Sequence, residues 1–75
     1  MDKTIFLLDK ERYATNEVSN LTERDLEKWV AEETYNDDYT IIKIDANGYE
    51  SVEIAINEEL PFINLNDYYI FSFGF

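Results

Sequence analysis

The chain has 75 residues and a formal net charge of −11, contains neither cysteine nor histidine, and is 16 % aromatic. Without these two residue types it has no disulfide framework, no thiolate zinc site and no histidine base. The aromatic content argues against disorder, so a single domain spanning residues 1–75 is expected. The apolar run from Ile5 to Leu8 is too short for a secretion signal or a membrane span, which favours a cytoplasmic protein.

Acidic residues are concentrated in the second part of the chain. Residues 1–28 hold seven acids and five bases, whereas residues 29–75 hold ten acids and one base, Lys43. A field of this sign repels nucleic acid and acidic membranes and attracts basic proteins. We therefore expect a basic protein partner, and no direct binding to nucleic acid or to membranes.

The first expected element is a strand from Thr4 to Leu8. Its apolar run does not alternate, which is typical of a strand covered on both faces in the interior of a sheet. The polar segment from Asp9 to Asn20 then predicts a long surface loop in which Tyr13 and Val18 are the large apolar groups. This loop is either an ordinary connection held by Tyr13 or a recognition element.

A helix is expected from Glu23 to about Tyr35. Thr22 is a good N-cap residue, Asp25 stands where a capping-box acid would stand, and the acidic run after Tyr35 supplies the stop. The predicted buried stripe consists of Leu26, Trp29 and Val30.

Glu33 is the one acid on the apolar face of this predicted helix. Either the last turn extends beyond the sheet and leaves Glu33 in water, or Glu33 is partly buried and held by a partner. The first interpretation is favoured because a buried unpaired carboxylate is costly.

The segment from Tyr39 to Ile56 predicts a β-hairpin, because runs of β-branched residues flank a turn sequence that ends in Gly48. A loop of Ala46, Asn47 and Gly48 pairs Ile42 with Val52 and Thr40 with Ile54. The opposite, open face would then carry the following residues: Tyr39, Lys43, Ser51 and Glu53.

Residues 57–67 predict a packed connection, since Pro61 forbids a central strand and Phe62, Ile63 and Leu65 require burial. The final eight residues predict a strand with Tyr69, Phe71, Phe73 and Phe75 on one face. The expected fold is therefore a β-α-β-β-β domain of the α+β class. In it, one helix packs on one face of a mostly antiparallel four-stranded sheet.

No motif for catalysis, a cofactor or a metal emerges from the sequence. A calcium loop with Gly48 at its sixth position would place Lys43 and Ile54 where acidic ligands are needed, so a turn is favoured. The adjacent acids of the loops are expected to face water, and an enzyme is not expected.

The leading functional hypothesis is a non-enzymatic, acidic protein-binding module. It would act as an inhibitor or charge mimic that docks a basic, nucleic-acid-handling protein. In composition the chain is similar in kind to small inhibitors that mimic nucleic-acid charge and to small immunity proteins, a similarity that transfers no residues. The expected partner-binding residues are Asp37, Asp38, Tyr39, Tyr49, Glu53, Glu58 and Glu59. The alternative is a structural or accessory protein that forms a homodimer through its aromatic C-terminal strand.

Overall fold

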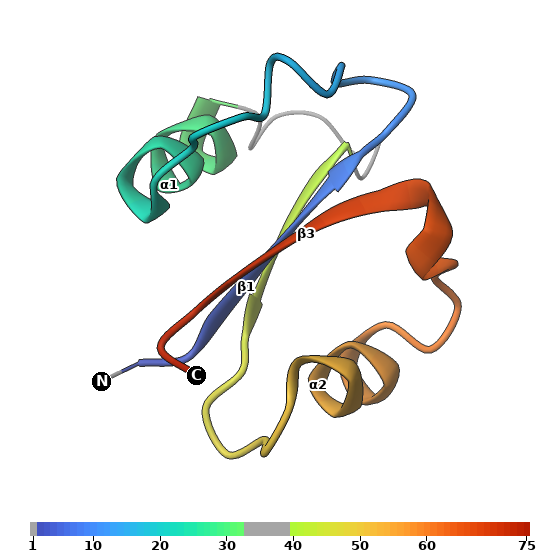
Figure 1. Ribbon diagram of the computed structural model, residues 1–75. Helices are drawn as coiled ribbons and strands as arrows, with labels where there is room; N and C mark the ends of the chain where they lie inside the picture. The colour runs from blue at the N-terminus through green and yellow to red at the C-terminus, as the bar shows by residue number, and fades with distance from the viewer. Residues whose placement is uncertain (1, 33–39) are drawn as a thin grey trace.

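The computed structural model describes residues 2–32 and 40–75. Three strands in this part of the chain form one antiparallel sheet in the order β2-β1-β3. The strands are β1 (Thr4–Asp9), β2 (Ile41–Asp45) and β3 (Tyr68–Phe73). Helix α1 (Glu23–Glu32) lies against one face of the sheet and helix α2 (Val52–Glu59) against the other (Figure 1). The predicted α+β class is confirmed, whereas the predicted four-stranded sheet with a single helix is wrong.

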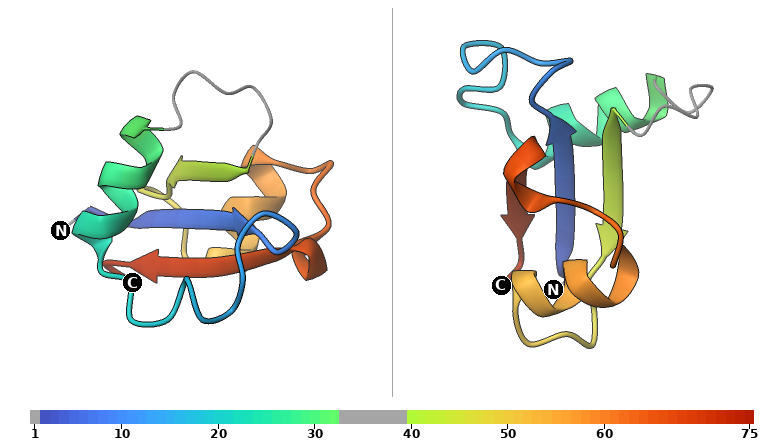
Figure 2. Two further views of the ribbon diagram at one scale, coloured as in Figure 1. Left: turned by 90° about the horizontal axis from the view of Figure 1, so that it is seen from above. Right: turned by 90° about the vertical axis from the view of Figure 1, so that its right-hand side faces the viewer.

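Strand β1 is the centre of the molecule, with β2 and β3 on either side of it (Figure 2). Residues Thr4 to Leu8 are all buried, as the unbroken apolar run predicted. Successive side chains point to opposite faces, so Phe6 and Leu8 pack towards α1, while Ile5 and Leu7 pack towards α2. Two separate apolar clusters therefore share this one strand.

The predicted start of α1 is confirmed by its capping box. The Asp25 N–H donates to Thr22 Oγ1 at 3.2 Å, and the Thr22 N–H donates to Asp25 Oδ2 at 3.0 Å. The bond that the Thr22 N–H donates to the carboxylate, and then the one from the Thr22 hydroxyl, lower the pKa of Asp25. Leu26 is buried and the other two residues of the predicted stripe are half-buried beside it. The predicted end of the helix, with Glu33 and Tyr35, lies outside the described residues.

The connection between β1 and α1 is a series of turns, as predicted, and its two large apolar residues hold it to the domain. Tyr13 and Val18 are both buried. The Tyr13 ring stacks on Trp29 of α1, with ring centroids 5.3 Å apart and planes 16° from parallel. This segment therefore contributes to the apolar cluster under α1.

The predicted hairpin is wrong, although its turn is present. The Asn47 N–H donates to Asp45 Oδ1 at 3.0 Å, and Gly48 adopts a φ of 93°, which a residue without Cβ reaches at little cost. The chain then enters α2 instead of a strand, because Ser51 caps a helix by accepting from the Ile54 N–H at 3.2 Å.

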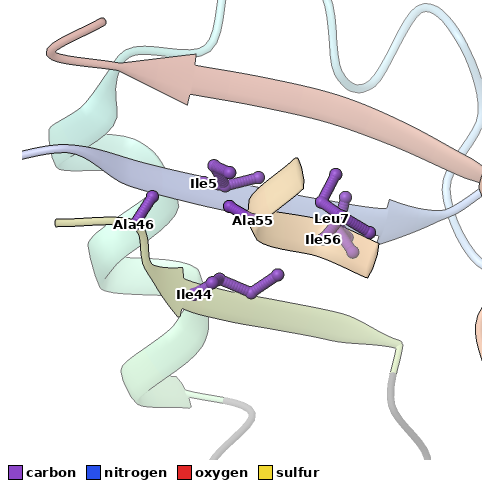
Figure 3. Close-up of a cluster of buried hydrophobic side chains, with 6 residues drawn as sticks. All are labelled: Ile5, Leu7, Ile44, Ala46, Ala55 and Ile56. Carbon is purple, nitrogen blue, oxygen red and sulfur yellow. The ribbon is translucent and has the colours of Figure 1, made fainter. Parts of the chain in front are cut away.

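Helix α2 covers the face of the sheet that carries Ile42 and Ile44, whereas the face of Lys43, which was predicted to be open, is the one on which α1 lies. Its Ala55 and Ile56 side chains point into the cluster formed with Ile5, Leu7 and Ile44 (Figure 3). The predicted pairings of Ile42 with Val52 and of Thr40 with Ile54 are absent from the described sheet, in which β2 pairs with β1. Ile54 points away from the sheet and is 47 % exposed.

Residues after α2 return the chain to the sheet through the 3-10 turn η1 (Leu65–Asp67). The predicted connection begins later than expected because α2 continues to Glu59. Ile63 and Leu65 pack at the edge of the α2 cluster, but Phe62 is 71 % exposed, contrary to its expected burial.

Strand β3 has the two faces that were predicted for it. Tyr69, Phe71 and Phe73 pack at the edge of the α1 cluster, where the rings of Phe6 and Phe73 meet edge to face. The strand ends before Gly74, whose φ of 87° and close approach to the Asp2 carbonyl leave no space for a Cβ. The two termini consequently lie side by side (Figure 1).

Candidate functional site

The predicted partner-binding residues fall into two groups. Asp37, Asp38 and Tyr39 lie outside the described residues. Tyr49 is half-buried in the turn before α2, and three exposed acids lie on that helix. These are Glu53, Glu58 and Glu59.

The open sheet face that was to present these residues does not exist, because α1 packs on one face of the sheet and α2 on the other. Lys43 lies on the α1 face of the sheet instead, with its Nζ 2.7 Å from Glu27 Oε1 of α1. Glu53 is on α2 and shares no face with Lys43. The predicted grouping of Lys43, Ser51 and Glu53 is therefore wrong.

Tyr49, just before α2, and Glu59, the last residue of α2, are in contact. The Tyr49 hydroxyl donates to Glu59 Oε1 at 3.1 Å. Partial removal of Tyr49 from water raises its phenol pKa, and the bond to Glu59 and the charges of Glu59 and Glu58 raise it further. Three of the seven predicted residues thus form one group at the C-terminal end of α2.

This group predicts a specific titration behaviour of Tyr49. In Glu59→Gln the amide oxygen still accepts the bond but the negative charge is gone, so the pKa of Tyr49 should fall towards its ordinary value. Because the folded-state pKa is raised, Tyr49 contributes stability that is complete below pH 10, about the unfolded value, and is lost as the pH rises through the folded value. The measurement is an NMR titration of the Tyr49 ring carbon that bears the hydroxyl.

Tyr68 provides the internal control for this titration. Its pKa is also raised, first by burial and then by the charges of Asp9 and Asp67, and Glu59 is not among the causes. The pKa of Tyr68 should therefore be the same in Glu59→Gln as in the wild type. Equal shifts at both rings would contradict the assignment of the Tyr49 shift to Glu59.

A surface hollow of about 250 Å³ lies between strand β2 and the end of α2, next to this group. We refer to it as the β2 hollow. It is lined by Ile42, Lys43, Ile44, Asp45, Glu59 and Leu60. Two isoleucines of β2 and the leucine that follows α2 therefore line the hollow together with two carboxylates, while the ammonium group of Lys43 is held by Glu27.

The β2 hollow runs along an unpaired strand edge. The Ala46 N–H donates to the Lys3 carbonyl at 2.8 Å, so these two residues form a hydrogen-bonded pair. Hydrogen-bonded and non-hydrogen-bonded pairs alternate along an antiparallel ladder, and this bond shows which pairs of β1 and β2 are which. Ile42 and Ile44 therefore direct their backbone groups to β1, and Lys43 directs its N–H and C=O outward. In the described part of the chain, no hydrogen-bond partner meets these outward groups.

The C-terminal turn of α2 adds negative potential beside the hollow. Glu58 and Glu59 stand at the end of the helix where the backbone dipole is already negative, and this turn contains no basic residue. Among the described residues the structure shows no group of three or more acids able to hold a metal ion. The arrangement is suited to hydrogen bonding and ion pairing with a cationic chain.

A second hollow, of about 240 Å³, lies where the end of β1 meets η1. Like the β2 hollow it is lined by acids and one lysine, but it lies at the end of the sheet instead of along the edge of β2. The β2 hollow is the stronger candidate.

Tyr49, Glu58 and Glu59 were named from the sequence as partner-binding residues, whereas their contact with one another and the strand edge beside them were missed. The available signal was Ser51, a good N-cap residue followed by an acid in the first turn, Glu53. Recognising α2 there would have made β2 an edge strand.

Comparison with family models, curated proteins and solved structures finds no match for this chain. No helix in the described ranges has the length and apolarity to cross a bilayer.

Proposed function

We propose that this protein is a non-enzymatic binding module that docks an extended, basic segment of another protein along the edge of β2. The observation that carries the proposal is the β2 hollow, in which an unpaired strand edge lies between the carboxylates of Asp45 and Glu59. An extended segment adds to such an edge through backbone hydrogen bonds, and its side chains supply specificity. The proposed site thus uses both the backbone and the charge of the domain.

The charges around the hollow favour a cationic occupant. Lys43 is the one base among residues 29–75, and its ammonium group is paired with Glu27. Arginine and lysine side chains of a partner would meet Asp45 and Glu59 at the rim and the negative end of α2 beside it. Charge attraction of this kind accelerates association and weakens with added salt.

The acids at the end of α2 support a binding role because they are unfavourable to the helix itself. A negative side chain near a helix C-terminus costs about 0.3 to 1 kcal/mol at an exposed site. Residues that break a local stability rule are concentrated at functional sites. Glu58 and Glu59 are therefore better explained by a partner than by the stability of the free domain.

The narrower form of the proposal is an inhibitor or charge mimic directed at a nucleic-acid-handling protein. Basic surfaces are common in that class of protein, and a net charge of −11 on 75 residues matches the sign of its usual ligand.

The test uses a synthetic peptide of alternating arginine and valine, titrated into the isotope-labelled protein and followed by NMR and calorimetry. We expect the largest amide shifts at Lys43 and Asp45, and affinity that falls with added salt. The double variant Glu58→Lys with Glu59→Lys should lose more than tenfold in affinity, about 1.4 kcal/mol, mainly through slower association.

The matched control is Glu11→Lys with Glu32→Lys, which changes the net charge equally at exposed acids outside the hollow. Circular dichroism checks that both variants are folded. Equal loss of affinity in the two variants, or amide shifts spread over the whole surface, would show general charge attraction and overturn the site. No binding of the peptide to the wild-type protein at low salt would overturn the proposed function.

A further inference from the structure

The outer edge of β3 is the second unpaired edge of the sheet. The Lys10 N–H donates to the Asp67 carbonyl at 2.9 Å, so these two residues form a hydrogen-bonded pair. Every second pair of β1 and β3 counted from this one is hydrogen-bonded as well. Tyr69 and Phe71 consequently direct their backbone groups to β1, whereas Ile70 and Ser72 direct theirs away from it. Within residues 2–32 and 40–75, no hydrogen-bond partner meets the groups of Ile70 and Ser72.

The outer edge of β3 lacks the residues that usually prevent exposed strand edges from pairing with one another. Exposed edges are usually protected by charged residues, proline or a bulge. The segment Tyr68–Phe75 contains no charged residue and no proline, in a chain whose net charge is −11.

Apolar side chains accompany the free backbone groups. Ile70 is opposite Leu7 on the α2 face of the sheet, but it is 42 % exposed because α2 packs over β1 and β2. Ser72, on the same face, is also exposed. Phe75, just beyond the strand, is 49 % exposed. The α2 face of the sheet is thus left partly uncovered along β3.

Each end of β3 lies beside both a lysine and an acid. At the first end, Lys10 lies with its Nζ 5.6 Å from the Tyr69 ring centroid, next to Asp67. At the other end, Lys3 and Asp2 flank the C-terminus, with Lys3 Nζ 5.4 Å from the Phe75 ring centroid. An antiparallel copy brings the first end of one strand to the second end of the other. Neither end of the strand pair therefore brings together charges of one sign only.

From these observations we infer that the outer edge of β3 binds a second copy of this chain, joining two three-stranded sheets into one continuous sheet. In the pairing that suits the side chains, Ile70 lies opposite Ile70 of the copy. Tyr69 then lies opposite Phe71, and Tyr68 opposite Ser72. Directly opposed residues of an antiparallel pair share a face and contact one another, so the exposed Ile70 side chains bury each other.

This interface is independent of the proposed binding of a basic segment at β2. The two edges are on opposite sides of β1, so a dimer would carry two β2 hollows at the far ends of its sheet. The contacts at β3 are mainly backbone and apolar, and the dimer should persist at salt concentrations that release a basic peptide. Loss of one interaction therefore leaves the other measurable.

The test is sedimentation equilibrium of the full chain from micromolar to millimolar concentration. The wild type should show a concentration-dependent monomer–dimer equilibrium that high salt does not abolish. Ile70→Lys places a charge at the centre of the interface and should weaken dimerisation by more than tenfold. Ile54→Lys is the matched control, because it adds the same charge at a comparably exposed isoleucine on α2 and should leave the equilibrium within about threefold of the wild type.

A second variant tests the backbone pairing without adding charge. Ser72→Pro removes an N–H that points away from β1, a position where an edge strand tolerates proline, and should also weaken the dimer more than tenfold. Ser72→Ala retains the N–H and should dimerise as the wild type does. A wild-type protein that stays monomeric at millimolar concentration would overturn the inference, as would equal effects of Ile70→Lys and Ile54→Lys. Circular dichroism identifies any variant that fails to fold.

Discussion

Replacing Phe6 by alanine is expected to lower the free energy of unfolding by about 3 to 5 kcal/mol. Phe6 is fully buried in the central strand, and its ring meets the Phe73 ring edge to face with centroids 5.9 Å apart. A domain of 75 residues has a total stability of about 4 to 11 kcal/mol. The loss is therefore a large fraction of the total stability, and the urea midpoint of the variant should lie well below that of the wild type.

Urea unfolding followed by circular dichroism and by the fluorescence of Trp29 measures this loss. The control is Phe62→Ala, which removes the same side chain from a position that is 71 % exposed and should change stability by less than about 0.5 kcal/mol. Similar losses in the two variants would contradict the placement of Phe6 at the centre of the sheet.

Ile56→Ala is expected to destabilise the domain by about 2 to 5 kcal/mol, while Ile54→Ala changes stability little. Ile56 is 1 % exposed and packs on β1, whereas Ile54 is 47 % exposed on the outer side of α2. Comparing the losses of stability in these two variants shows whether the segment is a helix or a strand. In a strand, residues two apart share a face and would have similar costs, but in a helix they point in directions about 160° apart.

The same unfolding experiment applied to both isoleucine variants measures the contrast. Equal losses would support a strand after the turn and contradict α2. A large loss at Ile56 alone would establish that the second face of the sheet is closed by a helix. This outcome also bears on the β2 hollow, which exists because α2 ends beside β2.

Features that depend on only a few neighbouring residues were predicted correctly from the sequence. The apolar run of β1, the capping box of Thr22 and Asp25, and the turn at Gly48 each fold through local contacts or through their own burial. The alternation along β3 likewise gave its two faces correctly. Tyr49, Glu58 and Glu59 were among the expected partner-binding residues, but the contact between Tyr49 and Glu59 was not predicted.

The segment Val52-Glu53-Ile54-Ala55-Ile56 was not readable in this way, because its apolar residues fit both a period of two and a helical period. Local turn chemistry favoured a hairpin, and the prediction followed it. The capping bond of Ser51 and the burial of Ala55 and Ile56 against Ile5 and Leu7 favour the helix. That burial depends on contacts between residues about fifty positions apart.

The sequence by itself determined that this chain has a fully buried central strand, an acidic second part and a capped first helix. An apolar run, a charge count and a capping box are properties of adjacent residues. Only the tertiary structure decided which element covers the second face of β1 and which strands become edges. A run buried on both faces requires two covering layers, but the sequence does not state which segment supplies the second one. Once α2 took that position, β2 and β3 were left with unpaired backbone groups, and these edges are where the proposed partners bind.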